Sequence, residues 1–542
     1  MEQLVLLGDE AIAQAAIDAG VTGIYAYPGT PSTEITEYAE RSGEAREGKI
    51  KACWCANEKT GMEAALGVSY AGRQGMVSMK HVGLNVAADP FINSAITGAN
   101  GGLLVVSADD PSMHSSQNEQ DSRYYGKFAM IPILEPGNQQ EAYDMVHEGF
   151  ALSERLHVPV LLRITTRLAH SRAVVKRHPA VTGQNPLQLP ENPMQYILLP
   201  LSARKRYREL LGKQERIMRE AEGSPYNRWI EGKDRSLGII AAGIAYNYLM
   251  EHYEDRKCPY PVVKIGHYPM PRKLMEDLCV SCEQILVLED GYPFIEELLR
   301  GYLDKGTKIR GRLDGSLPRD GELNPGVIAR ALGLPAHSGI PVPDMVVSRP
   351  PSLCKGCPHI YSYNALNEAM TSYTGGRVLS DIGCYSLGAL SPYKAINTLV
   401  DMGSSITMAK GAADAGLIPA VAVIGDSTFI HSGITGLIDA VDHHAPVTVV
   451  ILDNQTTAMT GGQPSPASSR IEQIVEGIGV EKEHIRVISP IPRKHEENVT
   501  IFSEELAYNG VSVIIPRREC IQTASRKLKQ AKNQTGSGEE GT

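Results

Sequence analysis

The most informative segment of the sequence is Ala420-Val421-Ala422-Val423-Ile424-Gly425-Asp426-Ser427, in the last third of the chain. Its five apolar residues predict a buried β-strand, and Gly-Asp-Ser marks the carboxyl end of that strand. A second apolar run, Val447 to Leu452, ends in Asp453-Asn454 after a spacing that suits one intervening helix. Strands separated by helices predict a parallel sheet that is covered on both faces. The sequence therefore predicts an α/β fold.

Polar residues stand where these two strands end, and ligands of open α/β sheets bind outside the carboxyl ends of the strands. Gly425 lets the backbone approach a phosphate closely, and the helix that follows points its N-terminus at the anion. Asp426 and Asn454 offer side-chain oxygens to Mg²⁺, and Thr456 offers its backbone carbonyl. The pattern indicates a magnesium–diphosphate site. Two unrelated turns are the alternative.

Four cysteines share this third of the chain. Cys354 and Cys357 form a Cys-x-x-Cys pair, Cys384 follows in a predicted strand-end loop, and Cys520 follows the last apolar run, Val513 to Ile515. All of these places can lie at one edge of a parallel sheet. Four thiolates suit either a [4Fe–4S] cluster or a structural Zn²⁺ ion, and the spacing does not choose between them.

The other five cysteines carry weaker signals. Cys279 and Cys282 form a second Cys-x-x-Cys pair without a partner pair nearby, which favours two buried thiols. Cys53 and Cys55 are interpreted as core residues, and Cys258 carries no signal. Disulfides are not expected, because we expect the chain to work in a reducing compartment.

The composition is that of an ordinary globular protein, with 542 residues, 42% hydrophobic content and a formal net charge of −9. This negative charge argues against nucleic acid as the main partner. The start shows no signal peptide, and the apolar runs are too short to cross a bilayer. We therefore expect a cytoplasmic protein without a nucleic-acid or membrane partner.

The alternation of helix and strand patterns divides the chain into three α/β regions, at residues 1–175, 236–340 and 352–522. The clearest predicted elements of the first two are a helix over 9–19 and strands over 23–27, 76–79, 102–107, 158–164, 237–241 and 284–288. Residues 176–235 predict a helical connector whose charged helix spans 204–222. A docking face for a partner subunit is the alternative for that helix.

A Pro-rich stretch, 339–351, predicts an interdomain linker. The end of the chain, 523–542, is a polar tail. We expect its last part, 534–542, to be disordered.

Glu58 opens a predicted helix that carries the apolar residues Met62, Ala65 and Leu66. A Glu at a helix start is usually a cap. If the diphosphate belongs to thiamine diphosphate, a second interpretation is stronger. That cofactor needs a buried carboxylate hydrogen-bonded to its aminopyrimidine ring, which relays a proton in a dry cleft.

Taken together, these motifs resemble the alpha subunit of the indolepyruvate:ferredoxin oxidoreductases. That family belongs to the thiamine-diphosphate-dependent 2-oxoacid:ferredoxin oxidoreductases. The resemblance covers about residues 3–522. The matching strings are Tyr27-Pro28-Gly29-Thr30-Pro31-Ser32, Asn57-Glu58-Lys59, Met79-Lys80-His81-Val82-Gly83-Leu84-Asn85, Cys354-Lys355-Gly356-Cys357-Pro358-His359, Gly425-Asp426-Ser427-Thr428-Phe429 and Leu452-Asp453-Asn454-Gln455-Thr456-Thr457-Ala458-Met459-Thr460-Gly461.

The resemblance implies two thiamine-diphosphate-binding domains around a smaller transketolase-C-like one. The pyrimidine-binding domain would be 1–175, the transketolase-C-like domain 236–340, and the diphosphate-binding domain with its iron–sulfur ligands 352–522.

The resemblance also implies residue roles. Catalytic residues are expected at Glu58, Thr30 and His81, with Asn85 in the same cleft. The cofactor is expected to contact Glu58, Gly383, Gly425, Asp426, Ser427, Asn454 and Thr456, of which Asp426, Asn454 and Thr456 hold Mg²⁺. The ligands of one [4Fe–4S] cluster are expected at Cys354, Cys357, Cys384 and Cys520.

The implied reaction is the oxidative decarboxylation of a 2-oxoacid, such as the aryl-2-oxoacid indolepyruvate, to an acyl-CoA and CO2. Coenzyme A, a smaller gamma-type subunit and a hetero-oligomer with a dimeric core are implied as well. Longer family members continue into a ferredoxin-like domain with two further cysteine quartets. This chain has no such run after Cys520, so we expect one cluster and electron transfer to a separate ferredoxin. A non-oxidative thiamine decarboxylase or carboligase, and a non-catalytic cluster- or zinc-binding subunit, are the alternatives.

Overall fold

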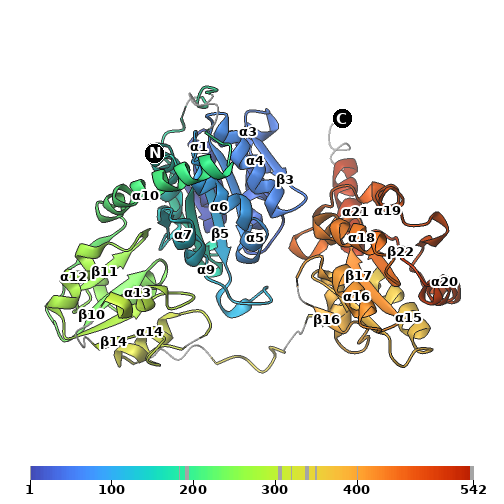
Figure 1. The fold of residues 1–542 in the computed structure, drawn as a ribbon. Helices are drawn as coiled ribbons and strands as arrows, with labels where there is room; N and C mark the ends of the chain where they lie inside the picture. The colour runs from blue at the N-terminus through green and yellow to red at the C-terminus, as the bar shows by residue number, and fades with distance from the viewer. Residues whose placement is uncertain are drawn as a thin grey trace, which may run out of the picture. The chain divides into compact units, whose positions relative to one another are not determined.

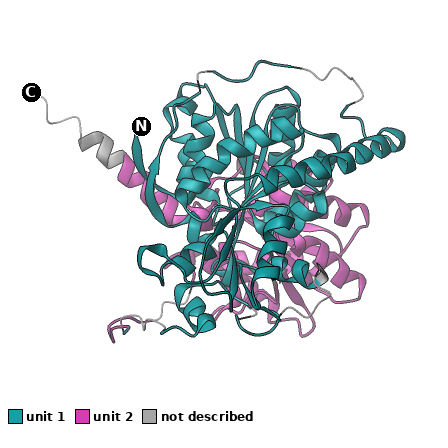
Figure 2. Ribbon diagram, turned by 90° about the vertical axis from the view of Figure 1, so that its left-hand side faces the viewer, with its two compact units in different colours: residues 1–341 teal, residues 342–542 magenta. Residues whose placement is uncertain are grey.

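The computed structural model describes residues 2–181, 183–188, 195–302, 308–318, 320–335, 341–347, 351–399 and 401–536. They fall into two compact units, residues 1–341 and 342–542 (Figures 1 and 2). The predicted linker 339–351 spans the boundary between the units, and residues 339, 340 and 348–350 lie outside the described part. In the described part, no helix combines the length and the apolar character needed to cross a membrane.

Unit 2 is built on a parallel sheet of six strands in the order β16-β15-β17-β18-β22-β21. The strands are β15 (Arg377–Ser380), β16 (Thr398–Leu399), β17 (Ala420–Gly425), β18 (Val447–Leu452), β21 (Ile485–Ile488) and β22 (Ser512–Pro516). The two central strands are those predicted from the opening motif. In the register of the sheet, Gly425 pairs with Leu452, so the residues that follow both strands leave the same edge.

Helices cover both faces of this sheet because successive strand residues point to opposite sides. Ala422 and Ile424 pack into one apolar core, with α16 (Ser404–Asp414), α18 (Ile434–Asp442) and α19 (Ile471–Ile478). Val421 and Val423 pack into a second core, with α15 (Pro358–Met370) and α20 (His495–Ala507). Figure 1 shows β17 among these helices.

Unit 1 holds a larger sheet in the order β12-β6-β7-β5-β4-β2-β3, parallel except for β12. Its strands are β2 (Gly23–Ala26), β3 (Lys51–Trp54), β4 (Gly75–Lys80), β5 (Leu103–Asp109), β6 (Ile133–Leu134), β7 (Val160–Thr165) and β12 (His267–Tyr268). Its helices are α1 (Gly8–Asp18), α2 (Thr33–Glu40), α3 (Gly43–Arg46), α4 (Glu58–Tyr70), α5 (His81–Val86), α6 (Ala88–Thr97), α7 (Arg123–Ala129), α8 (Gln139–Leu156) and α9 (Thr166–Ala169).

A second sheet of unit 1 has the order β14-β13-β10-β11-β9, with β9 antiparallel. Its strands are β9 (Arg228–Ile230), β10 (Gly238–Ala242), β11 (Val262–Ile265), β13 (Gln284–Leu288) and β14 (Lys308–Arg310). The helices of this part are α10 (Pro200–Glu222), α11 (Ala245–Met250), α12 (Arg272–Ser281), α13 (Phe294–Tyr302) and α14 (Pro325–Leu332). A separate antiparallel pair joins β1 (Gln3–Leu7) to β8 (Arg172–Lys176).

The predicted α/β fold class is confirmed, and the predicted strands and the charged helix are present within a few residues of their expected bounds. One prediction about the tail was wrong. Helix α21 runs from Ile521 to Gly536, so residues 534–536 are helical rather than disordered. Lys529, Gln530 and Ala531 are good helix formers that carry the helix onward. Residues 537–542 lie outside the described part.

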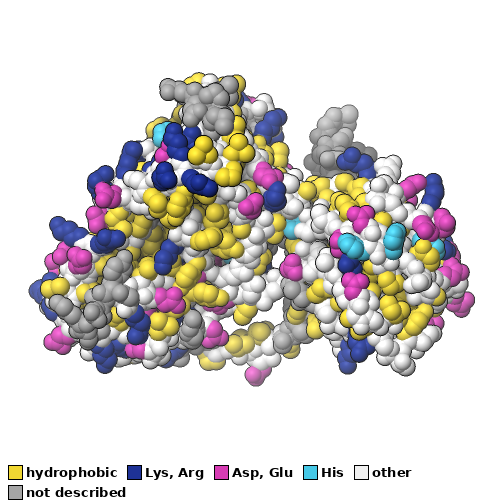
Figure 3. Space-filling view, in the orientation of Figure 1, with side chains coloured by type: hydrophobic (Ala, Val, Ile, Leu, Met, Phe, Trp, Pro, Cys, Tyr) yellow, Lys and Arg dark blue, Asp and Glu magenta, His cyan; other side chains and the backbone are white. Residues whose placement is uncertain are grey.

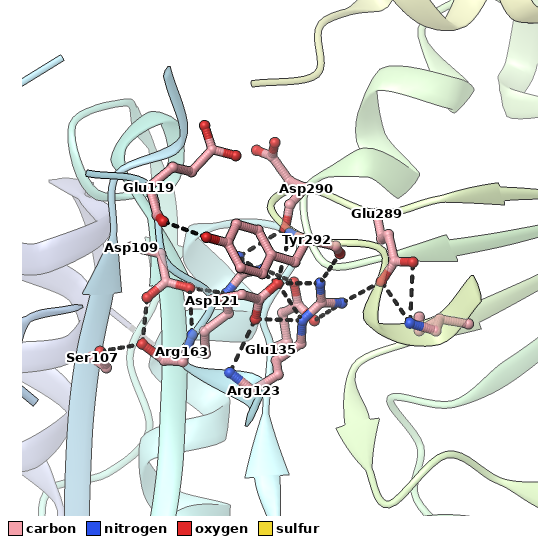
Figure 4. A network of polar contacts seen from close by, with 12 residues as sticks. Ser107, Asp109, Glu119, Asp121, Arg123, Glu135, Arg163, Glu289, Asp290 and Tyr292 are labelled. Atoms are coloured by element: carbon pink, nitrogen blue, oxygen red, sulfur yellow. Dashed lines mark hydrogen bonds and ion pairs between the residues drawn. The ribbon is translucent and has the colours of Figure 1, made fainter. Parts of the chain in front are cut away.

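A buried network of charges joins the two sheets of unit 1 (Figure 4). Arg163 on β7 donates to the carboxylate of Asp109 at 2.8 Å and to the carbonyl of Asp290 at 2.8 Å. Arg123 at the start of α7 lies 2.9 Å from the carboxylate of Glu289. Both guanidinium groups are completely buried. Asp290 and Glu289 follow β13, so these contacts tie the second sheet to the strand ends of the first.

The carboxylates of this network differ in their charge state because their neighbours differ. Burial alone would raise the pKa of Asp121, but the adjacent Arg123 and Arg163 bring that pKa down to about 2. Burial raises the pKa of Glu289 to about 7, against the attraction of Arg123. The two arginines therefore keep the Asp121 carboxylate ionised inside the protein.

Replacing Arg163 by Leu should lower the free energy of unfolding of unit 1 by about 3–5 kcal/mol, because it leaves buried carboxylates without a cation. Both tryptophans of the chain, Trp54 and Trp229, lie in unit 1, so fluorescence during urea unfolding reports on this unit. The matched control is Arg155→Leu, which removes an exposed pair with Glu220 and should change stability by about 1 kcal/mol or less. Equal effects of the two substitutions would contradict a supporting role for the network.

Candidate active site

Asp426 follows β17 at the carboxyl edge of the unit 2 sheet and is buried. Backbone N–H groups of Ser427 and Gln455 donate to its carboxylate, yet its Oδ2 atom has no hydrogen-bond donor. Burial, followed by repulsion from Asp453, raises the pKa of Asp426 to about 7. A buried carboxylate oxygen without a donor is costly unless a cation binds it. Asp426 therefore fits a hard divalent cation such as Mg²⁺.

Asn454 follows β18 at the same edge and connects two groups of residues. Its Oδ1 accepts the backbone N–H of Thr456 at 3.1 Å, and its backbone carbonyl accepts the N–H of Cys520 at 3.1 Å. Its Nδ2 lies 3.3 Å from His359 Nε2 and 3.8 Å from Cys384 Sγ. One residue thus contacts both the predicted magnesium ligands and the predicted cluster ligands.

The four predicted cluster ligands line one cavity of about 200 Å³, and Asn454 lines it too. Cys357 and Cys384 enter it from the start of α15 and from the loop after β15, and Cys520 from the start of α21. Cys354 completes the set. Burial and the neighbouring thiols raise the pKa of Cys357 to about 11 and the pKa of Cys384 further. These thiols stay protonated until a metal displaces their protons.

His359 is a site residue to which the sequence analysis gave no role. Its ring is buried, and its Nε2 lies 3.3 Å from Cys384 Sγ as well as 3.3 Å from Asn454 Nδ2. Burial lowers the pKa of His359 to about 4, so the ring is neutral and its Nε2 can accept the Asn454 amide hydrogen. In the sequence, the one sign that His359 belongs to the site was its position directly after Cys357-Pro358.

Gly383 and Gly425 face the same aromatic ring. A Cβ atom on Gly383 would meet the Tyr385 ring at 2.2 Å, and one on Gly425 would meet it at 2.5 Å. Tyr385 is therefore the neighbour that requires glycine at both positions in this structure. The sequence motif predicted a phosphate at Gly425 instead. Nearby, the hydroxyl groups of Ser427 and Thr457 lie 3.0 Å apart.

Glu58 lies in unit 1 at the first position of α4 and is buried. The N-cap is Asn57, whose side chain accepts the N–H of Thr60 at 2.9 Å, so the helix does not need Glu58 as its cap. The carboxyl group of Glu58 packs against α5 at Gly83, where an added Cβ would meet Glu58 Oε1 at 2.5 Å. The fold therefore reserves a buried place for this carboxyl group.

The other predicted residues of unit 1 lie close by. His81 begins α5, is buried, and its Nε2 lies 3.2 Å from the carbonyl of Asn118. The carbonyl of Thr30 accepts the hydroxyl of Ser115 at 3.3 Å. Asn85 is exposed at the end of α5, where its Oδ1 accepts the Tyr125 hydroxyl at 2.6 Å.

Lys80 is a second residue to which the sequence analysis gave no role. It directly precedes His81, its Cβ lies against Gly29, and its amine donates to the carbonyl of Ser115. Burial lowers the pKa of Lys80 to about 8, against the attraction of Asp110. A buried cation next to the Thr30 turn suits an anionic substrate group.

A larger cavity, of about 730 Å³, lies elsewhere in unit 1 and contains none of the predicted catalytic residues. Its wall is mostly apolar and comes from α10, α12, α13 and the segments 130–133 and 268–270, and Cys279 lines it as well. Figure 3 shows hydrophobic side chains gathered on this face of unit 1. Cys282 and Cys258 are buried. Cys53 and Cys55, expected in the core, are only half-buried, because β3 is the edge strand of its sheet.

Two known protein families match the chain. The family described as "Pyruvate flavodoxin/ferredoxin oxidoreductase, thiamine diP-bdg" matches residues 14–216, within unit 1. The family described as "Thiamine pyrophosphate enzyme, C-terminal TPP binding domain" matches residues 381–515, which include the ends of β15, β17 and β18.

Relatives of similar length support the same assignment. Indolepyruvate oxidoreductase subunit IorA of Archaeoglobus fulgidus is 39% identical, covering 98% of this chain and 88% of the relative. The IorA subunit of Pyrococcus abyssi is 38% identical with the same coverage of both chains. The 2-oxoglutarate synthase subunit KorA of Methanothermobacter thermautotrophicus is 28% identical over 32% of this chain and 46% of its own length.

A solved structure shares the fold. The 2-oxoglutarate:ferredoxin oxidoreductase from Magnetococcus marinus superposes with a TM-score of 0.51 and 16% identity, covering 61% of this chain and 65% of that chain. The near-complete match to the IorA subunits agrees with the thiamine-diphosphate motifs of both units. The chain therefore belongs to the IorA family of indolepyruvate oxidoreductases, which are thiamine-diphosphate-dependent 2-oxoacid:ferredoxin oxidoreductases.

Proposed function

We propose that the chain oxidatively decarboxylates a 2-oxoacid to an acyl-CoA and CO2 and passes the electrons through one [4Fe–4S] cluster to ferredoxin. This proposal rests on the position of Asn454. Its side chain accepts the N–H of Thr456, and the same residue lines the four-cysteine cavity. A non-oxidative thiamine decarboxylase has no use for four convergent thiols at that place.

Asp426, Asn454 and Thr456 would hold Mg²⁺ and, through it, the diphosphate of the cofactor. When bound, thiamine diphosphate supplies the carbanion and the electron sink for decarboxylation. The unpaired Oδ2 of Asp426 supports its role as the first ligand. His359 would act on Asn454, because accepting the amide hydrogen leaves the amide oxygen on the side of the metal ligands.

Cys354, Cys357, Cys384 and Cys520 would hold the cluster. The convergence of the four cysteines on one cavity, within a thiamine-diphosphate-binding domain, supports a cluster that carries electrons over a structural zinc ion. The cavity is lined largely by apolar atoms.

Glu58 would hold and return a proton at the aminopyrimidine ring of the cofactor. Thr30, Lys80 and His81 would form the wall that receives the 2-oxoacid. Lys80 would pair with the substrate carboxylate, because it is the buried cation beside the Thr30 turn.

The names of the relatives suggest the class of substrate. Their name refers to indolepyruvate, and we propose an aryl-2-oxoacid of this kind as the substrate. Coenzyme A would accept the acyl group, as the coenzyme A bound to the Magnetococcus marinus enzyme suggests. A smaller gamma-type subunit, a separate ferredoxin and a cytoplasmic location complete the proposal.

Glu58→Gln should lower turnover by about 100- to 10,000-fold while thiamine diphosphate stays bound, since the substitution removes a proton relay and keeps the shape. The measurement is anaerobic dye reduction that depends on indolepyruvate and coenzyme A, in enzyme co-expressed with the smaller subunit. Glu63→Gln, which changes the same charge on the exposed part of α4, is the control and should keep full activity. If the unchanged enzyme releases CO2 without reducing the dye, the protein is a non-oxidative decarboxylase and the proposal is wrong.

Cys384→Ser should lose the brown visible absorbance, the iron and the sulfide of anaerobically purified protein but keep its thiamine diphosphate. The ligand set loses one of four thiolates, whereas the diphosphate site keeps Asp426. Cys282→Ser changes a buried thiol outside the cavity and should leave the iron content unchanged. An intact cluster in Cys384→Ser would show that the ligand set is wrong.

Lys80→Met should raise the KM for the 2-oxoacid by about 10- to 100-fold and leave the KM for coenzyme A unchanged, because only the carboxylate loses a charged partner. In the unchanged enzyme the same KM should rise above pH 8, where Lys80 loses its proton. Lys176→Met, an exposed lysine on β8, is the control. A KM that is insensitive to Lys80→Met at every pH would remove Lys80 from the substrate site.

A further inference from the structure

Asp9 is a buried acid that the proposed reaction does not use. It lies in the first turn of α1, and its side chain is completely buried. Both carboxylate oxygens of Asp9 lack a hydrogen-bond donor. Among the described buried carboxylates, Asp9 alone has this property. Other buried acids of unit 1 have cations beside them: Asp18 lies 2.6 Å from Arg177, and Asp109 lies 2.8 Å from Arg163. Asp9 has no such neighbour among the described ion pairs.

Two further groups with metal-binding atoms surround Asp9. Glu34 lies in the first turn of α2, and His170 follows α9. One ligand atom from each of the three side chains lies within 4.8 Å of the others, and His170 Nε2 is 3.5 Å from Glu34 Oε2. Glu34 and His170 are partly exposed, so the group is buried at Asp9 and open to solvent at the opposite side.

Two carboxylates cannot both be ionised at this distance without a compensating charge. Burial, followed by the charge of Glu34, raises the pKa of Asp9 well above its ordinary value. Either the two acids share a proton or a cation lies between them. His170 adds an imidazole nitrogen on the open side, 3.5 Å from Glu34, and imidazole nitrogen is a common ligand of divalent transition metals.

We propose that Asp9, Glu34 and His170 bind one divalent transition-metal ion, in addition to the magnesium site at Asp426. Two carboxylate oxygens and one imidazole nitrogen are ligands that Zn²⁺ and Mn²⁺ accept, with water completing the coordination on the open side. The ligands come from three segments: the starts of α1 and α2 and the end of α9.

The ion would fix the start of α2, into which the Thr30 turn leads. Thr33 begins this helix, and its hydroxyl accepts the N–H of Gly29 at 3.1 Å. Holding Glu34 against Asp9 therefore also holds the turn that carries Thr30. The role of the ion is structural, and the site lies entirely within unit 1.

The test is a Mn²⁺ titration of the full chain, followed by the electron paramagnetic resonance of free Mn²⁺. Metal-free protein that carries Asp426→Ala is used, so that the magnesium site does not contribute. One Mn²⁺ ion should bind per chain. Adding Asp9→Asn or His170→Gln should weaken this binding at least tenfold. His170 is partly exposed, so its replacement tests the site even if Asp9→Asn fails to fold.

Glu37→Gln is the matched control, because it removes the same charge from the same helix outside the site. It should leave the binding of Mn²⁺ unchanged. Saturating Mn²⁺ should also raise the unfolding temperature of unit 1, read from tryptophan fluorescence, and should not do so in Asp9→Asn. The absence of saturable binding, or equal affinity in all variants, would overturn the proposal and leave a proton shared by Asp9 and Glu34.

Discussion

The parallel register of β15, β17, β18 and β22 is the constraint on which the candidate site depends. Parallel strands bring their carboxyl ends to one edge of a sheet, whatever their distance along the chain. Four segments that are far apart in sequence therefore leave the sheet side by side and carry Cys384, Asp426, Asn454 and Cys520. The apolar cores on both faces of the sheet hold this register.

The same edge carries buried groups that bound metal ions would stabilise. Asp426 has a buried oxygen without a donor, and the thiols of Cys357 and Cys384 are buried so that their protons are hard to remove. Bound cations would relieve both costs at once. Since Asn454 contacts Thr456 and Cys384, a change at one proposed metal site would reach the other through this residue.

Local patterns predicted the strands and the convergence of the cysteines, because apolar runs and strand-end residues report directly on a parallel sheet. The sequence did not predict Lys80 or His359 as site residues, because each is positioned by a neighbour that is distant in sequence. Lys80 contacts Ser115, and His359 contacts Asn454. The buried network of Arg123 and Arg163 could not be foreseen either. A charged residue in a sequence is ordinarily exposed, and only the packing of the two sheets in unit 1 shows that these are buried.

The central claim is that a magnesium-anchored diphosphate and a single iron–sulfur cluster lie next to each other at this sheet edge. Anomalous diffraction at the iron edge tests it most directly, with crystals of anaerobically purified protein grown with thiamine diphosphate and Mg²⁺. We expect one compact iron peak, enclosed by the four cysteines and adjacent to Asn454. A peak at the zinc edge alone, or an iron peak away from this cavity, would contradict it.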